Sequence, residues 1–377
     1  MTTWRHWAAL LGVFSLLTTG TAAAEPTTAD GWTSAFQNEH NTHWSGGDQT
    51  NSIRTTGNHQ IYFIHGDTMT MDEQMDGGGK GAGTYIAHSP GAVNNSIVRY
   101  IWFGADVVAP ATATSEAVPS PANTHLWGMD LTEANGAVYA LLADGTSGKF
   151  NGGGYLVKFT ENQDGTLTRS TGVAQLPYDA TKKIHWNNSI INLGDTIYIY
   201  GSDDAGKSYV SKVAASLIDW GFLGSWNLSY YSSSGWKPNQ ASAEQINSHV
   251  FRSVRAANGY LVATHRDNGY EATGAFGAVR TSTDDPQFQS PSQKSTTFTH
   301  ALVVAGQSTS AGNVSNPAYS VPIYTYCPTL HPELQPSGAS TLLIGIDWNT
   351  IHFEADYWKN AQAYKPRFFT VSSPDRW

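Results

Sequence analysis

Cysteine is almost absent from this chain of 377 residues, which contains only Cys327. With no second cysteine the chain cannot form an intramolecular disulfide, so stability in an oxidising compartment must come from a hydrophobic core. A chain of this length can bury such a core. Apolar residues flank Cys327, and we expect its thiol to be buried and slow to react.

Charge is also scarce. Charged residues make up 14% of the chain, with 30 acidic residues against 21 basic ones. No stretch has the run of Lys and Arg that follows a phosphate backbone, so we expect no nucleic-acid partner. Aromatic residues are plentiful at 12%, and such rings either pack in a core or stack on the apolar faces of sugars.

Long apolar runs are missing beyond the N-terminus, where none approaches the ~20 residues of a membrane span. Residues 1–24 have a basic start at Arg5, a short apolar run and the small-residue end AAA. This order is typical of a secretory signal peptide. We predict a secreted protein whose mature chain begins at Glu25, with no membrane partner.

Helical periodicity is weak throughout, and a β pattern repeats instead. Five segments each contain an alternating strand, a Gly or Asn turn and a second β-prone strand, usually followed by Asp. They are NSIRTTGNHQIYFIHGD, GMDLTEANGAVYALLADG, IHWNNSIINLGDTIYIYGSDD, HVFRSVRAANGYLVATHRD and TLHPELQPSGASTLLIGID. Their acidic ends recur every 60 to 80 residues or so, about the length of a four-stranded propeller blade.

We therefore predict an all-β fold, a single five-bladed β-propeller over residues 25–377. A β-sandwich with a second β domain is the alternative, and it explains the fivefold recurrence less well.

The first hairpin carries two aspartates at its open end. Gly57-Asn58 suits a tight turn, and counting outward from it places Asp48 opposite Asp67. Cross-strand Cβ atoms lie about 5 Å apart, close to the carboxylate spacing that glycoside hydrolysis uses. The alternative is that both aspartates cap turns or face water, since Gly and Asp are ordinary turn residues.

The same count on the other hairpins pairs further polar side chains. The predicted pairs are Asp130 with Asp144, His185 with Asp204, His249 with Asp267, and His331 with Asp347. Blades converge on one mouth near the propeller axis, so these groups would share a pocket. A register slip of one residue would turn any of them to the other face.

Four stretches together resemble a known family. They are GGD at 46–48, YFIHGDT at 62–68, YTYCPTLHPEL at 324–334 and YKPRFF at 364–369. They are similar to the secreted five-bladed propellers long catalogued as a domain of unknown function and now associated with endo-D-arabinanases acting on mycobacterial arabinan. In that family the aspartates of the GGD and GDT segments are implicated in catalysis, which implies Asp48 and Asp67 here. The chain departs from the family in YFIH and in the Gly-rich insertion at 76–83.

Further residues are candidates for contacting substrate or supporting the aspartates. They are Glu333, His331, His185, Trp186, His249, Asp267 and Asp347. Glu333 could tune a pKa in the pocket, and His331 could bond a sugar hydroxyl or orient an aspartate. Alternatively Pro332 starts an edge strand and Glu333 faces water.

Other chemistries lack their signatures. Thirteen histidines occur without HxH or HExxH spacing, and we predict no metal and no cofactor. The insertion contains Gly-Lys, but no Ser or Thr follows Lys80 and no helix follows the loop, which argues against phosphate binding. A GxSxG nucleophile elbow is absent.

These observations favour a secreted, monomeric glycoside hydrolase, endo-acting on an arabinofuranose-containing polysaccharide. One of Asp48 and Asp67 would donate a proton while the other acts as nucleophile or base. Two alternatives stay open. A lectin-like propeller needs aromatic platforms without paired carboxylates, and a polysaccharide lyase could use the arginines at 252, 255 and 266 to neutralise a uronate.

Overall fold

The computed structural model describes most of the chain from residue 26 onward. The described residues are 26–37, 46–69, 72–75, 85–88, 92–93, 96–101, 104–109, 117–121, 124–145, 150–266, 275–299, 309–310, 313–316, 321–336, 338–350 and 364–377. The predicted signal peptide, the Gly-rich insertion at 76–83 and Asp267 lie outside them.

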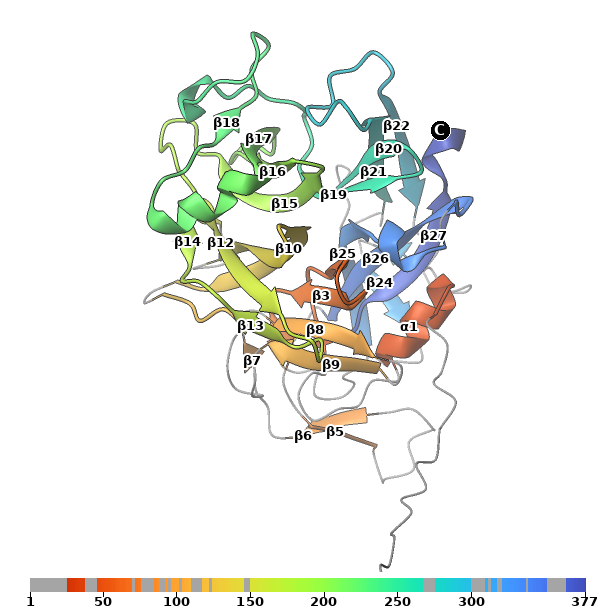
Figure 1. The fold of residues 1–377 in the computed structure, drawn as a ribbon. Helices are drawn as coiled ribbons and strands as arrows, with labels where there is room; N and C mark the ends of the chain where they lie inside the picture. Colours follow the sequence, from red (N-terminus) through yellow and green to blue (C-terminus); the bar gives the residue numbers. More distant parts are fainter. Residues whose placement is uncertain are drawn as a thin grey trace, which may run out of the picture.

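Strands dominate the described part, and five sheets there contain four or more strands each (Figure 1). The first sheet has the order β2 (Asn51–Arg54), β3 (Ile61–His65), β8 (Ser96–Ile101), β9 (Gly104–Ala109). The second has β10 (Leu126–Ala134), β11 (Ala137–Asp144), β12 (Asn151–Glu161) and β13 (Leu167–Arg169), with β14 (Ala174–Gln175) also paired to β12. The third has β15 (His185–Leu193), β16 (Thr196–Ser202), β17 (Ser208–Ala214), β18 (Ser229–Tyr230).

The remaining sheets complete the set. The fourth sheet has the order β19 (Phe251–Ala257), β20 (Tyr260–Arg266), β21 (Ala275–Ser282), β22 (Lys294–Thr299). The fifth has β23 (Thr309–Ser310), β24 (Asn313–Asn316), β25 (Val321–Leu330), β26 (Thr341–Thr350), β27 (Arg367–Ser372). Two smaller sheets join β1 (Gly46–Gly47), β4 (Thr68–Met69) and β7 (Ala92–Val93), and β5 (Asp72–Met75) with β6 (Tyr85–His88).

Helices are few among the described residues. They are α1 (Ala29–Gln37) and the 3₁₀ segments η2 (Ala215–Leu223), η3 (Gln240–Ser242), η4 (Pro332–Leu334) and η7 (Pro374–Arg376). Helix α1 packs on β27, where Trp32 and Phe36 lie against Phe368, and both rings also contact Phe63 of β3. None of these helices has the length and apolar character that a membrane crossing requires.

All five predicted hairpins are present, as β2–β3, β10–β11, β15–β16, β19–β20 and β25–β26. Two of their turns use Asn-Gly with positive φ at both residues, 52° and 69° at Asn135-Gly136 and 50° and 81° at Asn258-Gly259. Positive φ at both central positions matches the right-handed twist of hairpin strands, which is why this dipeptide closes them.

One strand of each large sheet lies toward a common centre (Figure 1). In ring order β2 contacts β10, β10 contacts β15, β15 contacts β19 and β19 contacts β25, while η4 beside β25 returns to β2. We refer to β2, β10, β15, β19 and β25 as the inner strands. This arrangement confirms the predicted class, an all-β propeller. The number of blades stays a prediction.

Side chains bond successive inner strands to one another at equivalent positions. The bonds run from Ile190 N–H to Asp130 Oδ2 at 2.9 Å, from Val254 N–H to Ser189 Oγ at 3.0 Å and from Leu330 N–H to Ser253 Oγ at 3.2 Å. Each satisfies a buried backbone donor that the sheet ladder leaves free. The inner strands are thereby fixed in height relative to their neighbours.

The hydrophobic core lies between the sheets. Five clusters of buried apolar side chains each draw on two adjacent large sheets. The cluster between the fifth and first sheets also includes Trp32 and Phe36 of α1. Because a cluster lies on each side of every large sheet, apolar residues on both faces of its strands are buried.

Four inner strands shift register near the end at which their hairpins open. The shifts fall between Gly128 and Asp130, His185 and Ser189, Phe251 and Ser253, and Tyr326 and Thr329. A bulge bends the strand and re-aims side chains. This is why the predicted pairing of Asp130 with Asp144 is wrong: Asp144 lies opposite Leu126, and Asp130 lies opposite Leu141.

Candidate active site

Asp48 and Asp67 lie opposite each other, as the hairpin count predicts. The β2–β3 ladder pairs Asn51 with Ile64, and it continues past the strands. The amide of Asp48 donates to the carbonyl of Asp67 at 3.2 Å, and the amide of Gly66 donates to the carbonyl of Asp48 at 2.9 Å. The two aspartates therefore sit at the open end of the first hairpin.

The glycines that precede Asp48 are required by close packing. A Cβ at Gly46 would lie 2.8 Å from the carbonyl oxygen of Tyr364, and one at Gly47 would lie 2.9 Å from the Cβ of His65. Neither distance is tolerated by a real side chain. The GGD motif thus lets the first hairpin approach both the closing segment and its own second strand.

Asp48 is surrounded by groups from the end of the chain. Tyr326 Oη donates to Asp48 Oδ2 at 3.1 Å, while Oδ1 is buried with no hydrogen-bond partner. Burial raises the pKa of Asp48 well above its usual range, and the negative charges of Asp67 and Asp347 raise it further. The hydrogen bonds from Tyr326 and Tyr364 oppose this shift only in part. Asp48 is set up to hold a proton.

Asp67 is more open than Asp48. Burial raises the pKa of Asp67, and a hydrogen bond from Trp127 and the charge of His125 oppose this rise only in part. Its carbonyl accepts a hydrogen bond from Tyr364 Oη at 3.2 Å. The pKa of Asp48 is raised further than that of Asp67, so Asp67 is the first of the two to ionise. Two adjacent carboxylates resist ionising together, which keeps the proton on Asp48.

Asp347 ties the fifth sheet to the segment that follows Asp48. Its carboxylate accepts hydrogen bonds from the amide of Gln49 at 2.5 Å, from the amide of Thr50 at 3.4 Å and from Thr50 Oγ1 at 2.7 Å. Gln49 has a φ of 57°, a left-handed conformation that costs a non-glycine residue free energy. Burial raises the pKa of Asp347 to about 7. The carboxylate holds this strained turn in place.

His65 supports the same region as a neutral group. It is fully buried, and burial lowers its pKa to about 3. Its Nδ1 lies 3.4 Å from Thr50 Oγ1, the hydroxyl that donates to Asp347. The imidazole stays uncharged throughout the neutral pH range.

An aromatic cleft of about 680 Å³ is connected to Asp67 through Trp127, although neither Asp48 nor Asp67 is among the residues that line it. We use this name for the space whose lining includes Trp127, Phe150, Tyr178, His185 and Arg252. The rings of Trp127 and Phe150 meet edge to face at 6.1 Å, and Tyr178 stacks on His185 at 5.7 Å. Trp127 both lines the cleft and bonds the carboxylate of Asp67, so this one side chain connects the cleft to the aspartate pair.

The histidines predicted for this mouth have different surroundings. His185 Nε2 lies 3.0 Å from Asp204 Oδ1, which confirms this predicted pair. Both residues line the aromatic cleft. His249 stacks on His265 at 4.3 Å. The proposed partner of His249, Asp267, lies outside the described residues.

Trp186 is a core residue. Its side chain is completely buried and packs on Tyr230 at 5.4 Å in the cluster between the second and third sheets. Its burial argues against the predicted contact with substrate. The sequence pattern is misleading here because both faces of the strand are covered, so an aromatic residue in it needs no ligand.

The predicted pairing of His331 with Asp347 is wrong. Asp347 lies opposite Tyr326, and the amide of His331 donates to Leu343 beyond the bulge in β25. The imidazole of His331 bonds Ser52 Oγ at 2.5 Å and Thr329 Oγ1 at 2.9 Å, deep in the fold. Burial lowers its pKa.

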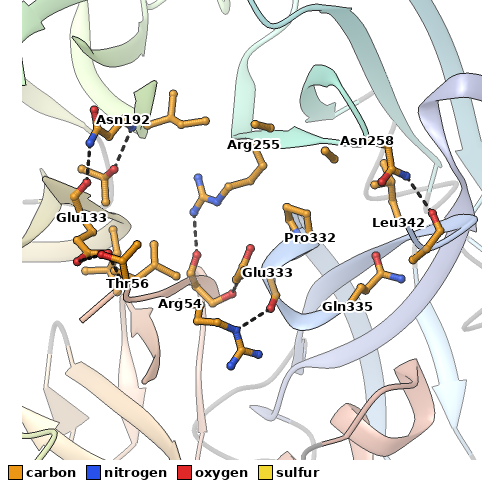
Figure 2. A pocket seen from close by; sticks show the side chains of 18 of the residues that line it. Arg54, Thr56, Glu133, Asn192, Arg255, Asn258, Pro332, Glu333, Gln335 and Leu342 are labelled. Carbon is orange, nitrogen blue, oxygen red and sulfur yellow. Dashed lines mark hydrogen bonds between the residues drawn. The ribbon is translucent and has the colours of Figure 1, made fainter. Parts of the chain in front are cut away.

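Glu333 lies at the other end of the inner strands from Asp48. Its carboxylate accepts a hydrogen bond from Ser52, and its side chain faces a second cavity that Arg54 also lines (Figure 2). The predicted role of Glu333 in tuning the aspartate pair has no geometric support. Arg255, a candidate neutraliser for a lyase, is bonded to the buried carboxylate of Asp130.

Sequence reasoning missed three side chains that shape the site, Trp127, Tyr326 and Tyr364. Both tyrosines fall in stretches that carry the family resemblance, YTYCPTLHPEL and YKPRFF, which was the available signal. Trp127 stands at the start of a predicted hairpin, one of 13 tryptophans, and nothing in the local pattern distinguishes it.

We find no candidate metal site in the part of the chain that the structure describes. No group of three or more His, Cys, Asp or Glu side chains is placed there to hold an ion.

The fold and site define an all-β propeller with an acidic pair at one mouth. The chain belongs to the family described as a domain of unknown function (DUF5005), which it matches over residues 32–374. A search of curated proteins found no match.

Solved structures share the fold at low sequence identity. A presumed hydrolase from Bacteroides ovatus has a TM-score of 0.60 and 15% identity, covering 89% of this chain and 88% of its own. A presumed exo-β-1,3-galactanase from Bifidobacterium bifidum has a TM-score of 0.49 and 8% identity, covering 93% and 92%. An exo-1,5-α-L-arabinanase from a bovine ruminal metagenomic library has a TM-score of 0.42 and 11% identity, covering 90% and 98%. The first likeness supports the propeller fold alone.

Proposed function

We propose that this protein is a glycoside hydrolase whose catalytic carboxylates are Asp48 and Asp67. The observation that carries the proposal is the opposed pair itself, in which burial and neighbouring charge raise the pKa of Asp48. Trp127 joins its partner Asp67 to a cleft lined with aromatic rings. Glycoside hydrolysis needs one carboxyl that holds a proton and one that is ionised.

Asp48 takes the role of general acid. Its proton passes to the glycosidic oxygen as the bond to the anomeric carbon breaks, and the leaving sugar departs as an alcohol. Asp67, ionised and bonded by Trp127, either takes a proton from the attacking water or attacks the anomeric carbon itself. In the second case water then cleaves the bond between the sugar and Asp67, giving up a proton to the ionised Asp48. The distance between the two carboxyl groups in the substrate complex decides between these outcomes.

Asp347 is a positioning residue in this scheme. It holds the amides of Gln49 and Thr50, which fixes the backbone on which Asp48 stands. When ionised, its charge also raises the pKa of Asp48. It touches no reacting atom.

The aromatic cleft is the proposed substrate site. Sugar rings present apolar faces that stack on aromatic side chains, and Trp127 offers such a ring directly beside Asp67. The more specific proposal is a secreted enzyme, endo-acting on arabinofuranose-containing polysaccharide. It is supported by the resemblance of the GGD and GDT segments.

We also propose that each of the five large sheets is one blade. Five core clusters, each shared by two neighbouring sheets, and the closed order of inner strands support this count.

The test is turnover by Asp48→Asn and Asp67→Asn on a panel of arabinans, arabinogalactan and other furanose and pyranose polymers, read as oligosaccharide release. Each variant should lose about 10²- to 10⁴-fold or more in rate, since Asn keeps the shape but cannot exchange the proton. The matched control is Asp284→Asn, an exposed aspartate outside both cavities. It should keep full turnover.

Folding must be checked in parallel by near-UV circular dichroism. If both variants fold and turn over a substrate at the parental rate, the pair is not catalytic. A glycan-binding propeller is the second candidate, favoured by the aromatic cleft alone. It predicts saturable glycan binding with no product from the parent protein.

A further inference from the structure

A second cavity of about 890 Å³ lies at the end of the propeller away from Asp48. We call it the far mouth. It is lined by the closing ends of four inner strands, β2, β10, β15 and β19, and by η4 with the start of β26 (Figure 2). All five large sheets contribute, so the cavity lies on the propeller axis. The reaction proposed above uses none of its side chains.

Acceptor groups in the far mouth are held in place but are not fully used. Glu333 accepts a bond from Ser52, and its side chain, 16% exposed, faces the cavity. Asn192 donates from Nδ2 to the carbonyl of Glu133 at 2.9 Å, which leaves Asn192 Oδ1 buried with no partner. A buried polar atom without a partner is costly unless a ligand or water satisfies it.

Donor groups converge on the same space. Arg54 Nε donates to the backbone carbonyl of Glu333 at 3.1 Å, which anchors the guanidinium at the edge of the cavity. Arg255, with a side chain only 8% exposed, donates to Asp130 and to the carbonyl of Ser52, while its Nε has no partner. The far mouth therefore presents fixed donors and fixed acceptors together.

The balance of groups selects the ligand chemistry. The acidic side chains of Glu133 and Glu333 would repel an anionic ligand, and the basic side chains of Arg54 and Arg255 would repel a cationic one. An apolar ligand would leave these polar groups unpaired. Among the described residues that line the cavity none is aromatic, so a nucleobase would have no ring to stack on there. Hydroxyl groups, which donate and accept at once, fit best.

We propose that the far mouth is a second binding site, which takes a neutral polyhydroxylated ligand such as the end of a saccharide chain. Its volume lies within the range of ordinary ligand pockets. The rigid ends of the inner strands supply the preorganisation that hydrogen-bond recognition requires. This site is independent of the proposed function, because it needs no catalysis.

Isothermal titration of the Asp67→Asn protein tests the proposal. The neutral probes are trisaccharides of arabinose, xylose and galactose, and the charged probes are glucuronate and spermidine. At least one neutral probe should bind with a dissociation constant in the millimolar range or tighter. Adding Glu333→Ala to this protein should weaken binding at one site about tenfold or more, since it removes a charged acceptor.

A second variant keeps the test open if Glu333→Ala fails to fold. Ala256 is exposed and lines the far mouth, so Ala256→Trp fills the cavity without removing any polar partner. It should abolish far-mouth binding, while the control Asp284→Asn leaves it unchanged. In the otherwise wild-type chain, Ala256→Trp should also leave turnover unaffected. Asp48→Asn should abolish turnover and leave far-mouth binding unaffected. This separates failure of one proposal from failure of the other.

The proposal is overturned by any of three results. Neutral probes show no saturable binding, or the charged probes bind in their place. In the third case, the affinity of every site survives both Glu333→Ala and Ala256→Trp.

Discussion

Replacing Arg255 by Met should be among the most damaging single changes to this fold. Arg255 forms a two-pronged bond to Asp130, whose side chain has no exposed surface. Met fills much of the same volume but carries no charge. In the variant, Asp130 keeps three uncharged donors, the hydroxyl of Ser189 at 2.6 Å and the amides of Leu131 at 2.8 Å and Ile190 at 2.9 Å.

The expected cost follows from burial. Removing one partner of a buried ion pair leaves the other charge uncompensated, which costs about 3–5 kcal/mol. In urea this should lower the unfolding midpoint by roughly 1 M or more, with an unchanged slope. Adding Asp130→Asn removes the stranded charge, so the double variant should be more stable than the sum of the two single changes by about 1–3 kcal/mol.

An exposed pair serves as the control. Lys183 lies 3.8 Å from Asp204, and the two side chains are 58% and 62% exposed. Because water screens this pair, Lys183→Met should change stability by no more than about 0.5–1 kcal/mol. Equal losses from Arg255→Met and Lys183→Met would refute the argument from burial.

Three further predictions concern single positions. Native protein should label slowly at Cys327 with a thiol reagent, because the side chain is 1% exposed, and fast labelling would contradict its burial. Gly128→Ala should destabilise the fold by about 1–3 kcal/mol or more, since its Cβ would overlap the carbonyl of His65, while Gly172→Ala, with open space around it, should be nearly neutral in the same urea titration. The pKa of Asp347, about 7 in the fold against about 3.9 unfolded, means that the native state binds the extra proton, so its contribution to stability falls as pH rises from 4 to 7. Asp347→Asn should remove this slope from a plot of melting temperature against pH, and an unaltered slope would show that another group causes it.

Local signals explain what the sequence could predict. The hairpins are closed by Gly and Asn turns a few residues long, so their positions follow from short-range chemistry. The opposition of Asp48 and Asp67 was predictable because no bulge interrupts the pairs from Asn51 to Arg54 with their partners. A count outward from the turn then keeps its register.

Bulges and ring closure explain what could not be predicted. A single extra residue near Asp130 breaks the count, and no sequence signal marks it. The bond from Tyr326 to Asp48 joins residues 278 positions apart, and Asp347 reaches Gln49 across 298. Such contacts depend on how the sheets close around the axis, which hairpin patterns do not encode. Covered faces likewise hide which aromatic side chains, such as Trp186, are core.

The junction of the first and fifth sheets gives the site a fixed place in the order of synthesis. Asp48 and Asp67 emerge from the ribosome well before Tyr326, Asp347 and Tyr364 do. Until then the two carboxyl groups stand in water, with the acidity of any exposed aspartate. The nascent chain thus contains both aspartates long before it contains Tyr326, Asp347 and Tyr364, the residues that make the proton affinities of the two aspartates differ.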